Sequence, residues 1–147
     1  MEYEHPIISL PDSFTGVLAT SDGTSTGART MSIVCFGEAF YFQTDSGSEK
    51  AAHISALNSA AVAFDNYEII GNCENLGHPF LPENEEVMRV YKKCFESAYK
   101  KYSALEQEVL FRLVPEKIKI WKYIDNKAYQ IINYPQRNET VFIELGY

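Results

Sequence analysis

The feature that most constrains the fold is a series of short apolar segments joined by tight-turn signals over the first 75 residues. Gly37-Glu38, for example, separates two such segments and is typical of a two-residue hairpin turn. The segment Ala28–Phe36 places Arg29, Met31 and Ile33 on one face by the two-residue period of a strand. This pattern predicts antiparallel strands over residues 14–20, 28–36, 39–44, 61–64 and 67–73.

Two helices and a second group of strands are expected in the rest of the chain. Ser46 is followed by Glu49, a capping-box pattern that predicts the start of a short helix running to about Leu57. Glu83–Tyr102 has an apolar stripe at helical spacing and is expected to form the longest helix. Further strands are expected at 109–114, 117–123, 128–132 and 140–145. Together, the expected strands and helices favour a mainly β fold of the α+β class, a small antiparallel barrel with two main helices.

Length and composition indicate one domain, residues 1–147, that is folded and cytoplasmic. Hydrophobic residues make up 46% of the chain, enough to offset the entropy lost on folding. We expect no signal peptide and no membrane span, because the N-terminal residues lack an apolar region and no apolar run approaches about 20 residues. Three widely spaced cysteines suit a reducing compartment.

The charged residues are unevenly distributed along the chain. The net charge is -7, which argues against nucleic acid as a partner, since that needs a positive field. The first 88 residues contain 13 acids and only two cations, Arg29 and Lys50. These two cations therefore become candidates for a specific role.

The segment Thr44–Lys50 has the composition of a phosphate-binding loop. An expected strand ends at Thr44, a Ser/Gly loop follows, and Lys50 falls in the first turn of the expected helix. The start of a helix offers free N–H groups and a partial positive charge, which bind phosphate well. A cation there opposes the helix dipole unless an anion is bound. A capped surface helix with an incidental lysine is the alternative, and Glu49 argues for it because its charge would repel a phosphate.

At this point the sequence resembles the pyridoxamine 5'-phosphate oxidase-like family of FMN-binding split-barrel proteins. The resemblance rests on an ordered set of segments over about residues 14–123: G-V-L-A-T, A-R-T-M-S, Y-F-Q-T-D-S-G-S-E-K, A-V-A-F, I-I-G and V-P-E-K-I-K-I-W. It implies a six-stranded split β-barrel that binds FMN between the two subunits of a homodimer. It also implies an FMN-dependent oxidoreductase that acts on a small molecule.

The resemblance assigns roles to particular residues. Arg29, Ser48 and Lys50 would bind the FMN phosphate, with Thr44 nearby, and the backbone of Thr30–Ser32 would lie beside the flavin ring. Asn66 and Trp121 would contact the cofactor across the dimer. The implied cofactor-binding set is Arg29, Thr30, Met31, Ser32, Thr44, Ser48, Glu49, Lys50, Asn66 and Trp121.

Three departures set the chain apart from the vitamin-processing oxidases. Glu49 stands where the family has an arginine that contacts the phosphate, and Val34 stands where those oxidases have a basic residue for the substrate phosphate. The segment 122–127 replaces the run that recognises the pyridine substrate. We therefore expect a divergent member with the cofactor half of the site and a different, unidentified substrate.

The histidines of the chain leave haem as an alternative cofactor. Some relatives of this fold bind haem, which needs an axial histidine, and His53 or His78 could supply it. The spacing of His5, the other histidines and the cysteines does not match a zinc site, so no metal is expected. Cys73 has no evident role. The alternatives to an FMN enzyme are therefore a non-catalytic flavin or haem binder or redox sensor, or a protein that uses a deazaflavin.

Overall fold

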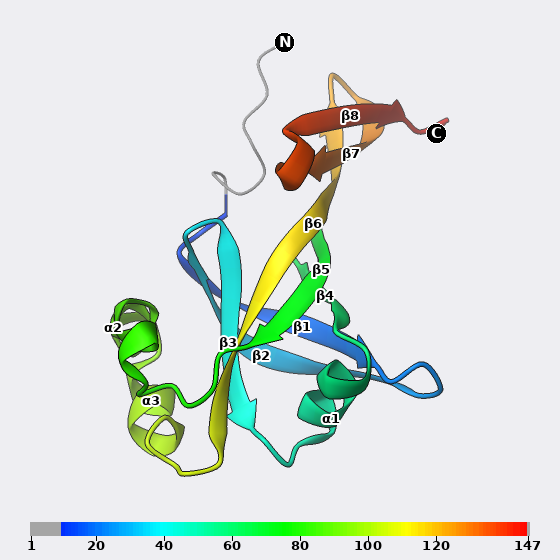
Figure 1. Ribbon diagram of the computed structural model, residues 1–147. Helices are drawn as coiled ribbons and strands as arrows, with labels where there is room; N and C mark the ends of the chain where they lie inside the picture. Colours follow the sequence, from blue (N-terminus) through cyan, green and yellow to red (C-terminus); the bar gives the residue numbers. More distant parts are fainter. Residues whose placement is uncertain (1–9, 147) are drawn as a thin grey trace.

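The computed structural model describes residues 10–146 and shows antiparallel strands curved into a barrel, with helices packed outside it (Figure 1). The strands are β1 (Ser13–Ser21), β2 (Thr26–Phe36), β3 (Ala39–Asp45), β4 (Ser59–Phe64), β5 (Tyr67–Asn75), β6 (Glu108–Ile124), β7 (Lys127–Tyr134) and β8 (Glu139–Glu144). The helices are α1 (Glu49–Ala56), α2 (Glu85–Cys94) and α3 (Glu96–Tyr102), with 3₁₀ turns at Pro82–Asn84 and Pro135–Arg137. None of the helices within residues 10–146 has the length and apolar character needed to span a bilayer.

Six of the strands form the barrel, and the predicted split-barrel fold is confirmed. The order is β3-β2-β1-β4-β5-β6, and pairing of β3 with β6 closes it. Strand β6 continues beyond the barrel, where β7 pairs with its far end and β8 pairs with β7, and these strands form an arm (Figure 1). Because β3 and β6 close the barrel, β7 and β8 lie outside it.

A bulge explains why one strand was predicted as two. The prediction broke the chain near Pro115, whereas β6 runs unbroken from Glu108 to Ile124. The pairing with β5 shifts register at Ile70/Gly71, directly opposite Pro115. Proline has no N–H to donate and is tolerated at such an irregularity. A Cβ on Gly71 would lie 2.0 Å from the Val114 carbonyl oxygen, so glycine permits this close approach.

The predicted long helix is instead two helices, which corrects the expectation over 83–102. Phe95 has φ -133° and ψ 58°, outside the helical region, and separates α2 from α3. Val87, Met88 and Tyr91 of α2 are buried against the outer face of the β2–β3 hairpin. The apolar stripe was therefore correct for α2, while α3 has no fully buried residue.

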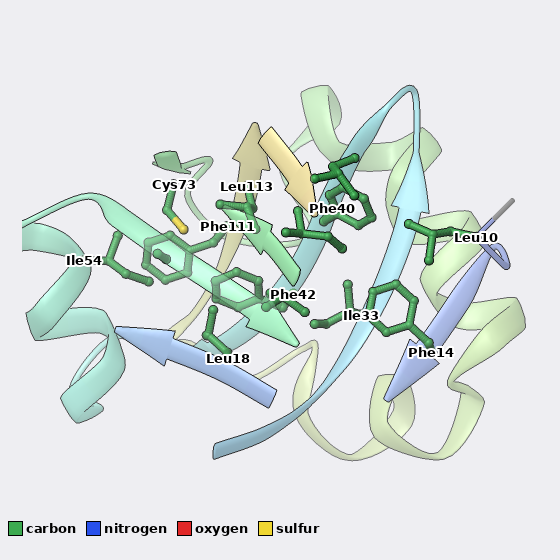
Figure 2. Close-up of a cluster of buried hydrophobic side chains, with 14 of the residues drawn as sticks. Leu10, Phe14, Leu18, Ile33, Phe40, Phe42, Ile54, Cys73, Phe111 and Leu113 are labelled. Carbon is green, nitrogen blue, oxygen red and sulfur yellow. The ribbon is translucent and has the colours of Figure 1, made fainter. Parts of the chain in front are cut away.

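The barrel interior is filled by aliphatic and aromatic side chains (Figure 2). Phe42 and Phe111 stack with ring centroids 5.5 Å apart, and Ile54 of α1 joins the same cluster. Cys73 also belongs to this core, with 4% of its surface exposed, and burial raises the pKa of its thiol to about 12. Cys73 is thus a core residue in neutral thiol form.

The β2–β3 hairpin opens soon after its turn. Gly37 and Glu38 have φ of 57° and 61°, as the predicted two-residue turn requires. Only three residue pairs follow, from Phe36↔Ala39 to Val34↔Tyr41, before the strands diverge. Beyond this point β2 pairs only with β1 and β3 only with β6 within the described residues. The split of the barrel therefore exposes two strand edges that face each other.

Candidate functional site

A pocket at the split is lined by some of the predicted cofactor-binding residues, whereas Arg29 and Ser48 are not part of its lining. The pocket has a volume of about 330 Å³, and its lining includes three of the predicted residues, Met31, Thr44 and Lys50. The rest of its lining is Gln43, Asp45, Tyr102, Leu105 and Glu108. It is built by the open edge of β3, the start of α1 and the connection from α3 to β6.

Arg29 lies on β2 beside the start of α1. Its Nη1 donates to the Thr20 hydroxyl at 2.7 Å and to the Leu18 carbonyl at 3.3 Å. Its Nη2 forms an ion pair with Glu49 at 3.1 Å. The side chain of Arg29 is 21% exposed and is held by three partners, whereas that of Glu49 is 69% exposed and lies mostly in solvent. The carboxylate of Glu49 thus occupies a position that an external anion could take.

Lys50 lies close enough to Arg29 for the two charges to interact. Burial, followed by the positive charge of Arg29, lowers the pKa of Lys50. Lys50 forms none of the ion pairs found among residues 10–146. Two cations that repel each other at a helix start would both be stabilised by a bound anion.

Ser48, not Ser46, caps α1, which corrects the predicted capping box. The Ser48 hydroxyl accepts from the Ala51 N–H at 3.2 Å, and the Thr44 hydroxyl donates to it at 3.2 Å. The helix therefore begins at Glu49, two residues later than the box implied. The backbone N–H groups of Glu49 and Lys50 fall in its first turn, where no intrahelical partner exists.

Gly27 provides the space for the Arg29–Glu49 pair. A Cβ at this position would lie 2.4 Å from Arg29 Nη2 and 2.6 Å from Glu49 Oε1. Any other residue would therefore push the pair away from β2. The sequence shows only an unremarkable glycine on a strand, so this role could not be predicted from it.

A buried histidine contacts the same threonine hydroxyl that holds Arg29. His53 of α1 is 4% exposed, and its Nδ1 lies 2.9 Å from the Thr20 hydroxyl that Arg29 also contacts. Its Nε2 lies 3.4 Å from Ser25 Oγ. The Thr20 hydroxyl thus accepts from Arg29 and shares a second hydrogen bond with His53. Thr20 and His53 were not predicted as parts of this site.

Asn66 and Trp121 lie together but do not line the pocket. Asn66 Nδ2 donates to the Trp121 carbonyl at 2.7 Å, and the Trp121 N–H donates back to the Asn66 carbonyl at 3.2 Å. The Trp121 ring is 42% exposed and meets Tyr123 edge-on at 4.8 Å. An exposed aromatic pair of this kind is available to a molecule or subunit outside the chain.

Thr30 and Ser32 lie on the edge of β2 that faces the split. Thr30 pairs with Val17 and Ser32 with Thr15 on the β1 side, and neither has a strand partner on the other side in the described part of the chain. Their backbone is therefore accessible at the open edge. Val34, in contrast, is fully buried beneath α2, so no substrate phosphate could bind there.

Both described histidines have their two ring nitrogens engaged. His78 Nδ1 accepts from the Phe80 N–H at 3.0 Å, which leaves Nε2 to donate to the Leu105 carbonyl at 2.9 Å. His53 has the two contacts given above. An axial bond to haem iron would require one of these hydrogen bonds to break. His5 lies outside the described residues.

Comparisons with known proteins place the fold. No family model matches the sequence, and no curated protein is significantly similar to it. Among solved structures, a pyridoxamine 5'-phosphate oxidase-related FMN-binding protein from Nostoc punctiforme matches with a TM-score of 0.59 and 14% identity, covering 90% of this chain and 88% of that one.

Two further structures show how varied the proteins with this fold are. HutZ, the haem storage protein of Vibrio cholerae, matches with a TM-score of 0.64 and 16% identity over 72% of this chain and 84% of that one. PhzG from Burkholderia lata, solved with tetrahydrophenazine-1-carboxylic acid, matches with a TM-score of 0.60 and 15% identity over 89% and 81%. At such identities the fold is shared, and the ligand has to be argued from the residues.

Proposed function

We propose that the chain is a divergent pyridoxamine 5'-phosphate oxidase-like flavoprotein that binds FMN at the split of its barrel. The observation that carries this proposal is the convergence of Arg29 and Lys50, the only two cations of the first 88 residues, at the start of α1. The acidic surroundings make a chance meeting of two cations at a helix start a poor explanation. A phosphate dianion is the ligand that such an arrangement stabilises.

The residues present fit the phosphate of FMN. Lys50 and the first-turn N–H groups of α1 would donate to it, and the Thr44 and Ser48 hydroxyls lie beside them. Arg29 would add a second positive group once Glu49 turns away. Breaking this exposed ion pair costs about 0–1 kcal/mol, whereas a charge-assisted hydrogen bond to phosphate contributes about 1.5–3 kcal/mol. Phosphate binding therefore outweighs the opposing carboxylate.

The flavin ring would lie along the open edge of β2. The backbone groups of Thr30–Ser32 would contact its polar edge, and Met31 would supply an apolar contact from the pocket. When bound, FMN supplies hydride and electron transfer. The protein would orient the ring and exclude water from it, and the substrate would be a small molecule other than a pyridoxine phosphate, since Val34 is buried.

A homodimer is part of the proposal. A pocket of about 330 Å³ is at the small end of the roughly 300–1,000 Å³ typical of ligand sites, so one chain leaves much of a flavin uncovered. Val17, Trp121 and Tyr123 are large side chains exposed on barrel strands and could cover the cofactor of a second subunit. The three free cysteines are consistent with our expectation of a cytoplasmic location.

The occupied nitrogens of His53 and His78 favour a flavin over haem as the cofactor. The purified protein should show flavin absorption, or bind added FMN in a titration, and should not show the Soret band of haem. Bleaching of bound FMN by NAD(P)H would support an oxidoreductase, and bound FMN that no donor reduces would indicate a carrier or sensor. Binding of a deazaflavin in preference to FMN, or of neither, would contradict the proposal.

A further inference from the structure

A buried glutamate shares the pocket with Lys50. Glu108, the first residue of β6, is only 6% exposed and lines the pocket that also contains Lys50 and Thr44. No motif in the sequence marks this position as part of a site. An acidic side chain in a site proposed for a dianion needs an explanation.

A hydrogen-bond chain fixes one side of this carboxylate. Gln43 Nε2 donates to Glu108 Oε2 at 2.7 Å, and Ser103 Oγ donates to Gln43 Oε1 at 2.8 Å. In this arrangement the NH₂ group of Gln43 meets Glu108, and the amide oxygen of Gln43 meets Ser103. All three residues are buried, so the carboxyl group is held in a fixed place.

Charged and titratable groups from several elements face Glu108, and Tyr102 of α3 lines the same pocket. Asp45 of β3 lies opposite it in the sheet, Lys50 comes from α1, Tyr91 from α2, and His78 from the loop before α2. Burial is the largest influence and raises the pKa of Glu108, and the Asp45 charge acts in the same direction. The hydrogen bond from Gln43 opposes this change most, followed by the charges of Lys50 and His78.

We infer that Glu108 takes up a proton when a phosphate-like dianion binds beside Lys50. The inference rests on the proposed function only for the identity of the anion as FMN. Glu108 and the anion compete for the same lysine across one pocket, and Gln43 prevents the carboxylate from turning away. Neutral Glu108 removes the repulsion, so anion binding and protonation reinforce each other. Glu49 is different, since its exposed side chain can move into solvent.

The test uses two anions and the intact protein. Sulfate keeps its charge from about pH 5 to about pH 9, so any pH dependence of its binding belongs to the protein. Its binding is followed by the amide NMR signals of Gly47–Lys50, and FMN binding by calorimetry in two buffers of different ionisation enthalpy. For the wild type we expect the dissociation constant for sulfate to rise about tenfold from about pH 5 to about pH 8.

Two variants separate Glu108 from the other groups that titrate. Glu108→Gln should bind sulfate with the low-pH affinity of the wild type and vary less than about threefold over the same range. Glu106→Gln is the matched control, because it removes the same charge from an exposed position two residues away and should keep the wild-type pH dependence. An unchanged pH dependence in Glu108→Gln would assign it to the histidines and overturn the inference.

A measurement on the wild type covers the case in which Glu108→Gln does not fold. The carboxyl ¹³C signal of Glu108 should titrate about one pH unit higher in protein saturated with sulfate than in free protein, since a tenfold coupling is reciprocal. An identical titration would overturn the inference. If FMN binds without this coupling, only the inference fails. If sulfate shows the coupling and FMN does not bind, only the proposed function fails. If neither anion binds, both fail.

Discussion

The two ends of β3 are buried alike but differ in chemistry. The closed end, nearer the hairpin turn, contains Phe40 and Phe42, which are fully buried and apolar. Phe40 pairs with β2, and Phe42, one residue past the last β2 pair, pairs with Phe111 of β6. At the other end Gln43 and Thr44 are 6% and 7% exposed, yet both are polar and each needs a hydrogen-bond partner. Burial by itself therefore does not distinguish core from site. The distinction comes from the polar partners that the split of the barrel brings to one end.

The largest effect is expected at the closed end, for Phe42→Ala. The variant leaves a cavity against Phe111 and should lower the free energy of unfolding by about 3–5 kcal/mol. Urea denaturation followed by circular dichroism measures the change. Thr44→Val, at the open end, is the comparison and should lower the free energy of unfolding by less. A loss below about 1 kcal/mol for Phe42→Ala would mean that the closed end is not the stabilising half.

At the open end, Arg29→Ala and Lys50→Ala should affect binding more than stability. Each should weaken FMN binding at least tenfold, because a lost charge-assisted bond costs about 1.5–3 kcal/mol. Fluorescence titration of FMN measures the affinity, and Lys93→Ala, an exposed lysine on α2, serves as the charge control. If both variants bind FMN as the wild type does, the phosphate site lies elsewhere.

A smaller loss of affinity is expected for Gly27→Ala. The added Cβ displaces Arg29 and Glu49 at their flexible ends, so stability should change by less than about 1 kcal/mol while FMN affinity falls about two- to fivefold. The same titration tests it. Gly23→Ala offers a control without contacts, although its positive φ of 97° adds backbone strain that lowers stability alone. Wild-type affinity in Gly27→Ala would show that the position of Arg29 is not critical.

The smallest effect, of opposite sign, is expected for Glu49→Gln. Removing the carboxylate frees Arg29 and should tighten FMN binding about two- to fivefold, in line with the 0–1 kcal/mol of an exposed ion pair. Unfolding should be nearly unchanged. Glu85→Gln, which removes another exposed ion pair on α2, should leave FMN binding as it is. Weaker binding in Glu49→Gln would make Glu49 a contributor to the site.

Local patterns in the sequence predicted the strands and the hairpin turn, whereas the shared role of Arg29 and Lys50 was implied by the family resemblance and remains a prediction. Those features depend on residues close in the chain or on the two-residue period of a strand. The break at Phe95 and the continuity of β6 past Pro115 were missed, since each depends on packing against another element. Glu108 could not be predicted, because its partner Gln43 is 65 residues away in the chain. The predicted contacts of Asn66 and Trp121 with a cofactor remain predictions.

The unbroken run of β6 has a consequence for how the molecule opens. Phe111–Leu113 lie between β3 and β5, Leu110 lies between β3 and the loop that follows β5, and Ile118–Ile120 lie between β5 and β7. Amide exchange at these positions requires two ladders to separate together. The centre of β6 should therefore exchange its amide hydrogens last, at the free energy of global unfolding, while β8 exchanges first. The barrel and the arm therefore share one long strand, β6, that unfolds cooperatively. The split of the barrel reaches this strand only at its first residue, Glu108.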